Sequence, residues 1–141
     1  MEYTYKYPRP AVTVDIIIIK NPCEDPEMLL IQRLNPPYKD QWALPGGFVD
    51  MDETCEEAAH RELMEETGLD NIILQQFKTY SGVNRDPRGR TISIVYSGIA
   101  RNDVTPKAGD DAKSTRWFKF SNLPDLAFDH DKIISEFREN H

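Results

Sequence analysis

The stretch Gly47–Leu69, GFVDMDETCEEAAHRELMEETGL, joins a glycine, a helix-capping signal and an acidic segment in 23 residues. Thr54 followed by Glu57 matches a capping box, in which each side chain binds the other residue's backbone N–H at the start of a helix. Gly68 suits the left-handed position that commonly closes a helix. The pattern therefore predicts a helix over Thr54–Thr67.

Three carboxylates gather on one side of this predicted helix. At about 100° per residue, Glu62, Glu65 and Glu66 fall within an arc of about 100° that also holds small residues, which favours a face turned toward the protein. Like charges at this spacing repel each other, and their removal from water makes the repulsion worse. A hard divalent cation would balance them. The alternative is a solvated, glutamate-rich surface helix with ordinary ion pairs to Arg61.

The residues just before the helix support a site there. Pro45-Gly46-Gly47 predicts a tight turn that exposes a backbone carbonyl, because glycine permits close approach. Glu53 lies where it can pair with Arg61 and fix the loop over the carboxylates. This context favours the metal-binding interpretation over the solvated helix.

The spacing of Gly47, Glu53 and Arg61–Leu69 is similar to the Nudix box at every defined position, and on these residues the chain is identified as a member of the Nudix hydrolase family. The resemblance implies an α/β/α sandwich with a mixed sheet, as a single domain over residues 1–141. It also implies hydrolysis of a nucleoside diphosphate linked to another group. Arg61 and Glu53 are expected to form an orienting pair beside the site.

The same resemblance implies a metal centre. Glu62 and Glu66 are expected to ligate Mg²⁺, for which Mn²⁺ could substitute, with Glu65 sharing or supporting the ligand shell. The carbonyl of Gly46 is the further expected ligand.

The general base stays open between two kinds of residue. Family members use a glutamate of the box helix or an acidic residue in a loop ahead of a late tryptophan. Here that tryptophan is Trp117, and the loop candidates are Asp111 and Asp110, for which a solvated acidic turn is the alternative interpretation. We assign Asp111 a part in metal or water activation as a hypothesis.

The other periodic segments predict strands before and after the box helix and a second helix near the end of the chain. Its apolar face would hold Ile133, Ile134 and Phe137. The order of strands, helix, strands and helix favours a mixed sheet between helices over a βαβ repeat. The predicted strands cover residues 11–20, 28–33, 42–44, 72–80, 91–100 and 115–120, and the helix covers 131–139.

The segments outside the box decide the expected substrate. Residues 9–15, 84–90 and 126–131 resemble the ADP-ribose pyrophosphatase branch, which implies cleavage of ADP-ribose to AMP and ribose 5-phosphate. Guanidinium groups bind phosphates through forked hydrogen bonds, and an aromatic ring can stack on adenine. The expected substrate contacts are Arg9, Arg85, Arg88, Arg90 and Phe128, with Tyr5 or Tyr7 as other stacking candidates. Two rival functions remain. One is a (d)NTP or oxidised-nucleotide pyrophosphatase. The other is a non-catalytic ADP-ribose sensor, which is less favoured because the short stretch after the start of the last helix leaves no room for a DNA-binding module.

Composition narrows the class of partner. The net charge of −7 argues against nucleic acid, because binding to its backbone depends on lysine and arginine. No apolar run approaches the roughly 18 residues of a membrane helix, and no signal-peptide pattern precedes the first strand, so a cytoplasmic protein that does not bind membranes is expected. Cys23 and Cys55 are too few for a disulfide scaffold. By analogy with related enzymes, residues 3–7 would contact a second copy in a homodimer.

Overall fold

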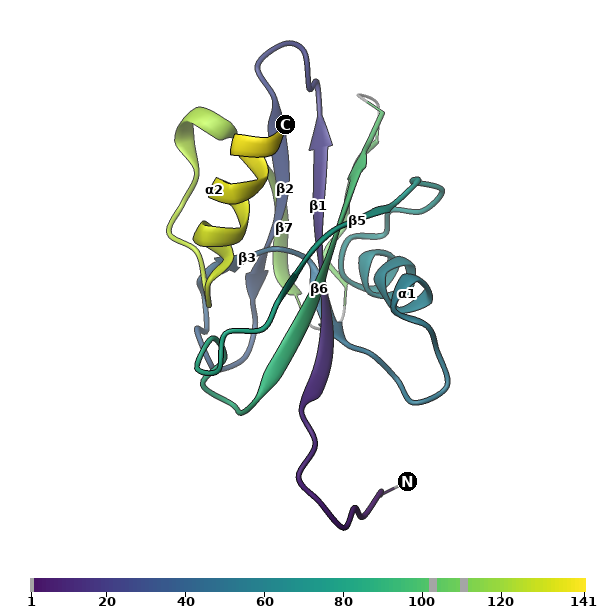
Figure 1. Ribbon diagram of the computed structural model, residues 1–141. Coiled ribbons are helices and arrows are strands. Elements are labelled where there is room, and N and C mark those ends of the chain that lie inside the picture. Colours follow the sequence, from purple (N-terminus) through teal and green to yellow (C-terminus); the bar gives the residue numbers. More distant parts are fainter. Residues whose placement is uncertain (1, 102–103, 110–111) are drawn as a thin grey trace.

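The computed structural model describes residues 2–101, 104–109 and 112–141. Strands, one central helix, further strands and a closing helix follow each other in the predicted order (Figure 1). The elements are β1 (Ala11–Lys20), β2 (Glu27–Arg33), β3 (Trp42–Ala43), β4 (Gly46–Phe48), α1 (Cys55–Thr67), β5 (Gln75–Tyr80), β6 (Thr91–Ile99), β7 (Ala112–Lys119), the 3-10 helix η1 (Phe120–Asn122) and α2 (His130–Asn140).

The strands form one mixed sheet with the order β3-β2-β1-β6-β5, to which β4 is added beside β1 and β7 beside β2. β1 runs parallel to β6, and the other strand pairs are antiparallel. β1 pairs with β4 over Thr13–Asp15 and with β2 only at Ile19–Lys20. β2 and β4 therefore pair with different ends of β1, and the sheet opens between them.

The two helices cover opposite faces of this sheet, so the predicted α/β/α sandwich is confirmed (Figure 1). In β1, Ile16 and Ile18 pack in the cluster that contains residues of α1, whereas Ile17 and Ile19 pack in the cluster that contains residues of α2. Because both faces of β1 are covered there, its stretch Ile16–Ile19 is an unbroken apolar run rather than an alternating one.

Helix α1 begins and ends where its sequence predicts. Thr54 and Glu57 make both bonds of the capping box, and Gly68 closes the helix with φ of 74° while its N–H donates to the Met64 carbonyl at 2.9 Å. None of the helices in the described part of the chain is long and apolar enough to cross a membrane.

One local prediction is wrong: Gly46 and Gly47 belong to strand β4 rather than to a tight turn. Two glycines in three residues give no strand signal, since glycine has low strand propensity. The position nevertheless demands glycine, because a Cβ on Gly46 would lie 2.1 Å from the Val14 carbonyl oxygen across the strand pair. Smaller differences concern the starts of β5, β7 and α2, which lie at Gln75, Ala112 and His130.

Candidate active site

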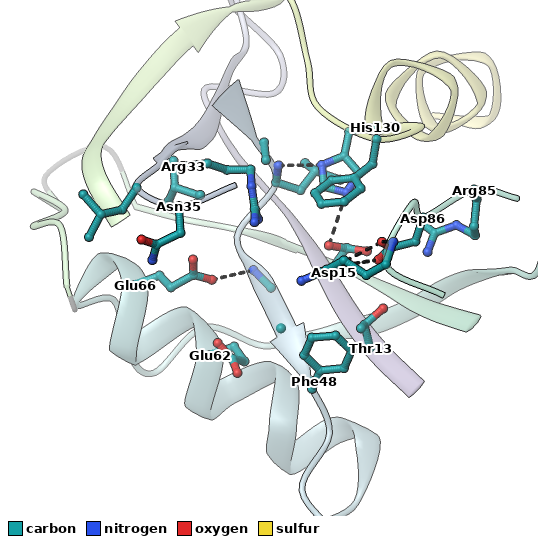
Figure 2. Close-up of a pocket in the computed structure, with 18 of the residues that line it drawn as sticks. Thr13, Asp15, Arg33, Asn35, Phe48, Glu62, Glu66, Arg85, Asp86 and His130 are labelled. Atoms are coloured by element: carbon teal, nitrogen blue, oxygen red, sulfur yellow. Dashed lines mark hydrogen bonds and ion pairs between the residues drawn. The ribbon is translucent and has the colours of Figure 1, made fainter. Parts of the chain in front are cut away.

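A cavity of about 410 Å³ lies where the sheet opens between β2 and β4 (Figure 2). Its walls come from β1, the end of β2, β4, α1, the loop before β6 and the start of α2. The polar and aromatic residues that line it are Thr13, Asp15, Arg33, Asn35, Phe48, Asp50, Glu62, Glu66, Arg85, Asp86, Arg88, Phe128 and His130.

Two of the predicted carboxylates lie against the backbone of β4. Glu66 is buried, and its Oε1 accepts a hydrogen bond from the Gly46 N–H at 2.7 Å. The Glu62 carboxylate occupies the place where a side chain on Gly47 would begin, since a Cβ there would lie 2.4 Å from Glu62 Oε1. The two glycines thus allow helix carboxylates and strand backbone to meet, and this arrangement presents only oxygen donors to a cation.

Arg61 connects the box loop to the helix. Its guanidinium binds both oxygens of Glu53, at 2.6 and 3.0 Å, and also donates to Glu62 at 3.0 Å and to the Phe48 carbonyl at 3.0 Å. The hydrogen bond between Glu53 and Arg61 is the largest cause that raises the pKa of Arg61 and lowers that of Glu53. The pairing expected from sequence is therefore present, and the same guanidinium also binds Glu62.

Glu65 departs from the predicted arrangement. Its side chain is 51% exposed, lies outside the cavity lining and makes an ion pair with Arg61 at 3.1 Å. The expectation that all three carboxylates face the protein is wrong for Glu65, because it stands at one edge of the helical arc, within reach of the arginine one turn earlier. Asp50, which the sequence did not single out, lines the cavity. The candidate base Asp111, with Asp110, lies outside the residues that the structure describes.

Asp15 and His130 form a buried pair that sequence reasoning missed (Figure 2). Asp15 Oδ1 lies 3.4 Å from His130 Nε2, and the Ser93 hydroxyl donates to the other Asp15 oxygen. The Leu44 N–H donates to His130 Nδ1 at 3.0 Å, so the proton of a neutral ring is on Nε2 and points toward Asp15. Burial by itself would raise the pKa of Asp15, but His130 and Ser93 more than offset this and hold it below its ordinary value.

Two predicted arginines reach the cavity in ion pairs. Arg85 binds both oxygens of Asp129, at 2.7 and 3.0 Å, and its side chain is 6% exposed. Arg88 binds Asp86, which is buried, with Nη2 at 2.7 Å from Oδ2. Phe128 also lines the cavity, as expected.

The other two predicted arginines, Arg90 and Arg9, lie outside the lining of this cavity, and their part as substrate contacts stays a prediction. Arg90 donates to the carbonyls of Ser81 and Gly82 and lies outside the cavity lining, as a residue that closes the turn before β6. Arg9 lies 3.9 Å from the ring centre of Tyr5 on the exposed N-terminal segment. Sequence distance from a motif does not tell which side chains fold back toward a cavity.

Arg33, at the end of β2, is a positively charged residue that lines the cavity and that the sequence did not indicate. Its Nε donates to the Pro37 carbonyl at 2.7 Å, and its guanidinium lies 5.0 Å from the ring centre of Phe128. Burial and the charge of Arg88 lower its pKa, so the two like charges stand close enough to oppose each other. An anion in the cavity would relieve that repulsion.

A family model described as the NUDIX domain matches residues 9–137. The chain therefore belongs to the Nudix family, and the predicted membership is confirmed. It is 50% identical over 132 residues to an ADP-ribose pyrophosphatase of Methanocaldococcus jannaschii, a match that covers 93% of this chain and 75% of that protein. It is 36% identical over 134 residues to the ADPR responsive transcriptional repressor NtrR of Acinetobacter baylyi, with 92% of this chain and 54% of the repressor covered.

Among solved structures, the NUDIX domain of Shewanella oneidensis NrtR complexed with ADP ribose is similar to this chain with a TM-score of 0.88 and 29% identity, over 98% of this chain and 93% of that one. The chain thus spans three quarters of the archaeal pyrophosphatase but about half of the Acinetobacter repressor.

Proposed function

We propose that this protein is a divalent-cation-dependent hydrolase that cleaves the pyrophosphate of ADP-ribose to AMP and ribose 5-phosphate. The observation that carries the proposal is the meeting of Glu62 and Glu66 with Gly46–Gly47 inside one cavity, which Arg88 and Phe128 also line. The 50% identity to the archaeal ADP-ribose pyrophosphatase supports the choice of substrate.

Glu62, Glu66 and the carbonyl of Gly46 are the residues that would hold the cation, with Glu65 as a supporting neighbour. Within the described part of the chain no cluster of three or more histidine, cysteine, aspartate or glutamate side chains could hold a metal by itself. A site with only two carboxylates and one carbonyl fits Mg²⁺, because Mg²⁺ keeps several bound waters and is also bound by substrate phosphates. Mn²⁺ would substitute for it. The cation would neutralise phosphate charge and lower the pKa of a bound water.

The protein's own groups would orient the substrate and guide the proton. In the reaction, the oxygen of a water molecule bonds to one phosphorus while the bridging oxygen leaves with the other phosphate, and a base takes the proton of the water. Arg33 and Arg88 would attract the diphosphate, whereas Arg61 holds Glu62 in position. For the base, Asp111 and a box glutamate remain the two proposals; an Asp111→Ala variant with wild-type kcat would eliminate the first.

The decisive experiment is a hydrolysis panel with Mg²⁺. ADP-ribose is expected to give AMP and ribose 5-phosphate, whereas the rival (d)NTP activity would release a nucleoside monophosphate and pyrophosphate. Glu66→Gln is the matched control, since it keeps the size of the side chain and removes its charge. Tight binding of ADP-ribose without turnover would instead identify a sensor domain. Hydrolysis in ¹⁸O-labelled water would show which phosphorus is attacked.

The partners and location form part of the same proposal. The net charge of −7 supports a small-molecule substrate rather than nucleic acid, and we place the protein in the cytoplasm as a homodimer whose contact includes residues 3–7. Light scattering after gel filtration would test the dimer with and without this segment, and cell fractionation would test the location.

A further inference from the structure

Phe128 has a backbone conformation that bulky residues rarely adopt. Its φ is 54°, in the left-handed region, and its half-buried ring lines the cavity. A non-glycine residue in this region persists only where its surroundings fix it, and such residues gather at ligand sites.

Contacts on both sides hold Phe128 in place. Before it, Ala127 is fully buried and its N–H donates to the Trp42 carbonyl at 2.8 Å. After it, Asp129 makes the two-pronged ion pair with Arg85. These contacts join the chain on either side of Phe128 to β3 and to the loop before β6.

The second anchor after Phe128 is deeper. His130 is bound through one ring nitrogen to Asp15 in β1 and through the other to the Leu44 N–H just after β3. Its ring centre lies 5.4 Å from that of Phe128. The start of α2 is thus attached to β1 and to Leu44. Leu44 lies two residues before Gly46, which is one of the predicted metal ligands.

The surroundings of the Phe128 ring suit a flat group joined to an anion. Tyr38 lies 4.8 Å from it, and the guanidinium groups of Arg33 and Arg88 lie 5.0 and 5.2 Å from its centre. Aromatic rings stack on one another and on guanidinium planes, and the same cations attract phosphate. Adenine is the one aromatic group of ADP-ribose. With adenine on Phe128, the phosphates of ADP-ribose would extend toward Glu66.

We propose that Phe128 is the platform on which the nucleotide base stacks, and that Asp15, His130, Arg85 and Asp129 are positioning residues that hold this platform. This proposal rests on the proposed nucleotide hydrolysis at the same site. The proposal gives Arg85 a different task from the phosphate contact expected from the sequence, because its Nε and Nη2 already donate to Asp129 and its side chain is buried.

The test uses the fluorescent etheno derivative of AMP, which contains no pyrophosphate to hydrolyse, with the full-length protein. Stacking on Phe128 is expected to quench its emission. Phe128→Leu removes the aromatic face and should abolish the quenching, whereas Phe128→Tyr should preserve it. Phe48→Leu tests the rival platform, since Phe48 lines the same cavity and its ring centre lies 4.9 Å from the Arg88 guanidinium, but it is not held by Asp15, Asp129 or His130. Quenching lost in Phe48→Leu but kept in Phe128→Leu would overturn the proposal.

Kinetics with ADP-ribose provide the second readout. Stacking of one base commonly contributes enough that its loss raises KM about tenfold, so Phe128→Leu is expected to do so with kcat within about twofold of wild type. His130→Asn and Asp129→Asn should show the same pattern, and circular dichroism checks that each variant folds. A fall in kcat at constant KM in these variants would contradict a positioning role. Should the protein fail to hydrolyse ADP-ribose at all, the quenching experiment still decides where the base binds.

Discussion

Gly46 and Gly47 are neighbours in β4, yet alanine at each is expected to act differently. Neither has a positive φ, so the backbone conformation itself tolerates a side chain. At Gly47 a Cβ would lie 2.4 Å from Glu62 Oε1, and the next closest atoms also belong to the Glu62 carboxylate. Since ordinary contacts begin near 3.4 Å, this carboxylate must retreat by about 1 Å, a displacement that matters at a catalytic centre.

The magnitude follows from that displacement. A misplacement of about 1 Å in a catalytic arrangement costs on the order of 100-fold in rate, which corresponds to about 2.7 kcal/mol of lost transition-state stabilisation. Gly47→Ala is therefore expected to lower kcat/KM for ADP-ribose about 100-fold. Its melting temperature should stay close to that of the wild type, because the flexible end of a side chain moves and the backbone does not.

Gly46→Ala is the control in which folding suffers instead. There a Cβ would lie 2.1 Å from the Val14 carbonyl oxygen and 3.0 Å from the Cα of Asp15, so backbone atoms of β1 must shift. Overpacking of this kind costs about 1–3 kcal/mol. In a domain of this size that corresponds to a fall in melting temperature of roughly 3–15 °C.

Two measurements on the purified variants test this reasoning. Steady-state hydrolysis of ADP-ribose at saturating Mg²⁺ gives kcat/KM, and differential scanning fluorimetry gives the melting temperature. If Gly47→Ala retained more than half of the wild-type kcat/KM, or lost as much thermal stability as Gly46→Ala, the geometric account of Glu62 would be refuted.

Three further predictions concern metal binding, acid stability and the cavity arginines. Saturating MgCl₂ should raise the melting temperature of the wild type, because ligands stabilise the state that binds them, and Glu66→Gln should lose most of that increase in the same fluorimetric assay. Because the pKa of Glu53 is lowered, first by its hydrogen bond with Arg61, its contribution to stability is complete above its ordinary pKa of 4.5 and disappears as the pH falls through its folded value. Urea unfolding should show a stability difference between wild type and Glu53→Gln that shrinks below pH 4.5; a constant difference would contradict this. Arg88→Ala should raise KM for ADP-ribose about tenfold or more, as for a lost charged hydrogen bond, whereas Arg90→Ala should change it by less than about twofold; equal effects would place Arg90 at the site.

The sequence alone determined the elements whose signals are local. The Thr54–Glu57 capping box and Gly68 mark the two ends of α1, since both depend on contacts within a few residues of the chain. The predicted strand over residues 11–20 coincides with β1. The box spacing gave the family, and with it the sandwich and the position of Glu62 and Glu66.

The tertiary structure decided what depends on contacts between distant segments. Asp15 and His130 are far apart in the chain and carry no spacing signal, yet they meet in the lining of the cavity. Helical periodicity could place Glu65 on an arc but not determine whether that part of the arc meets the sheet or solvent. Arg90 and Arg33 could not be ranked for the same reason. Local patterns report which backbone conformation a segment favours, whereas a binding site is made where separate segments pack, and that packing is set by the whole core.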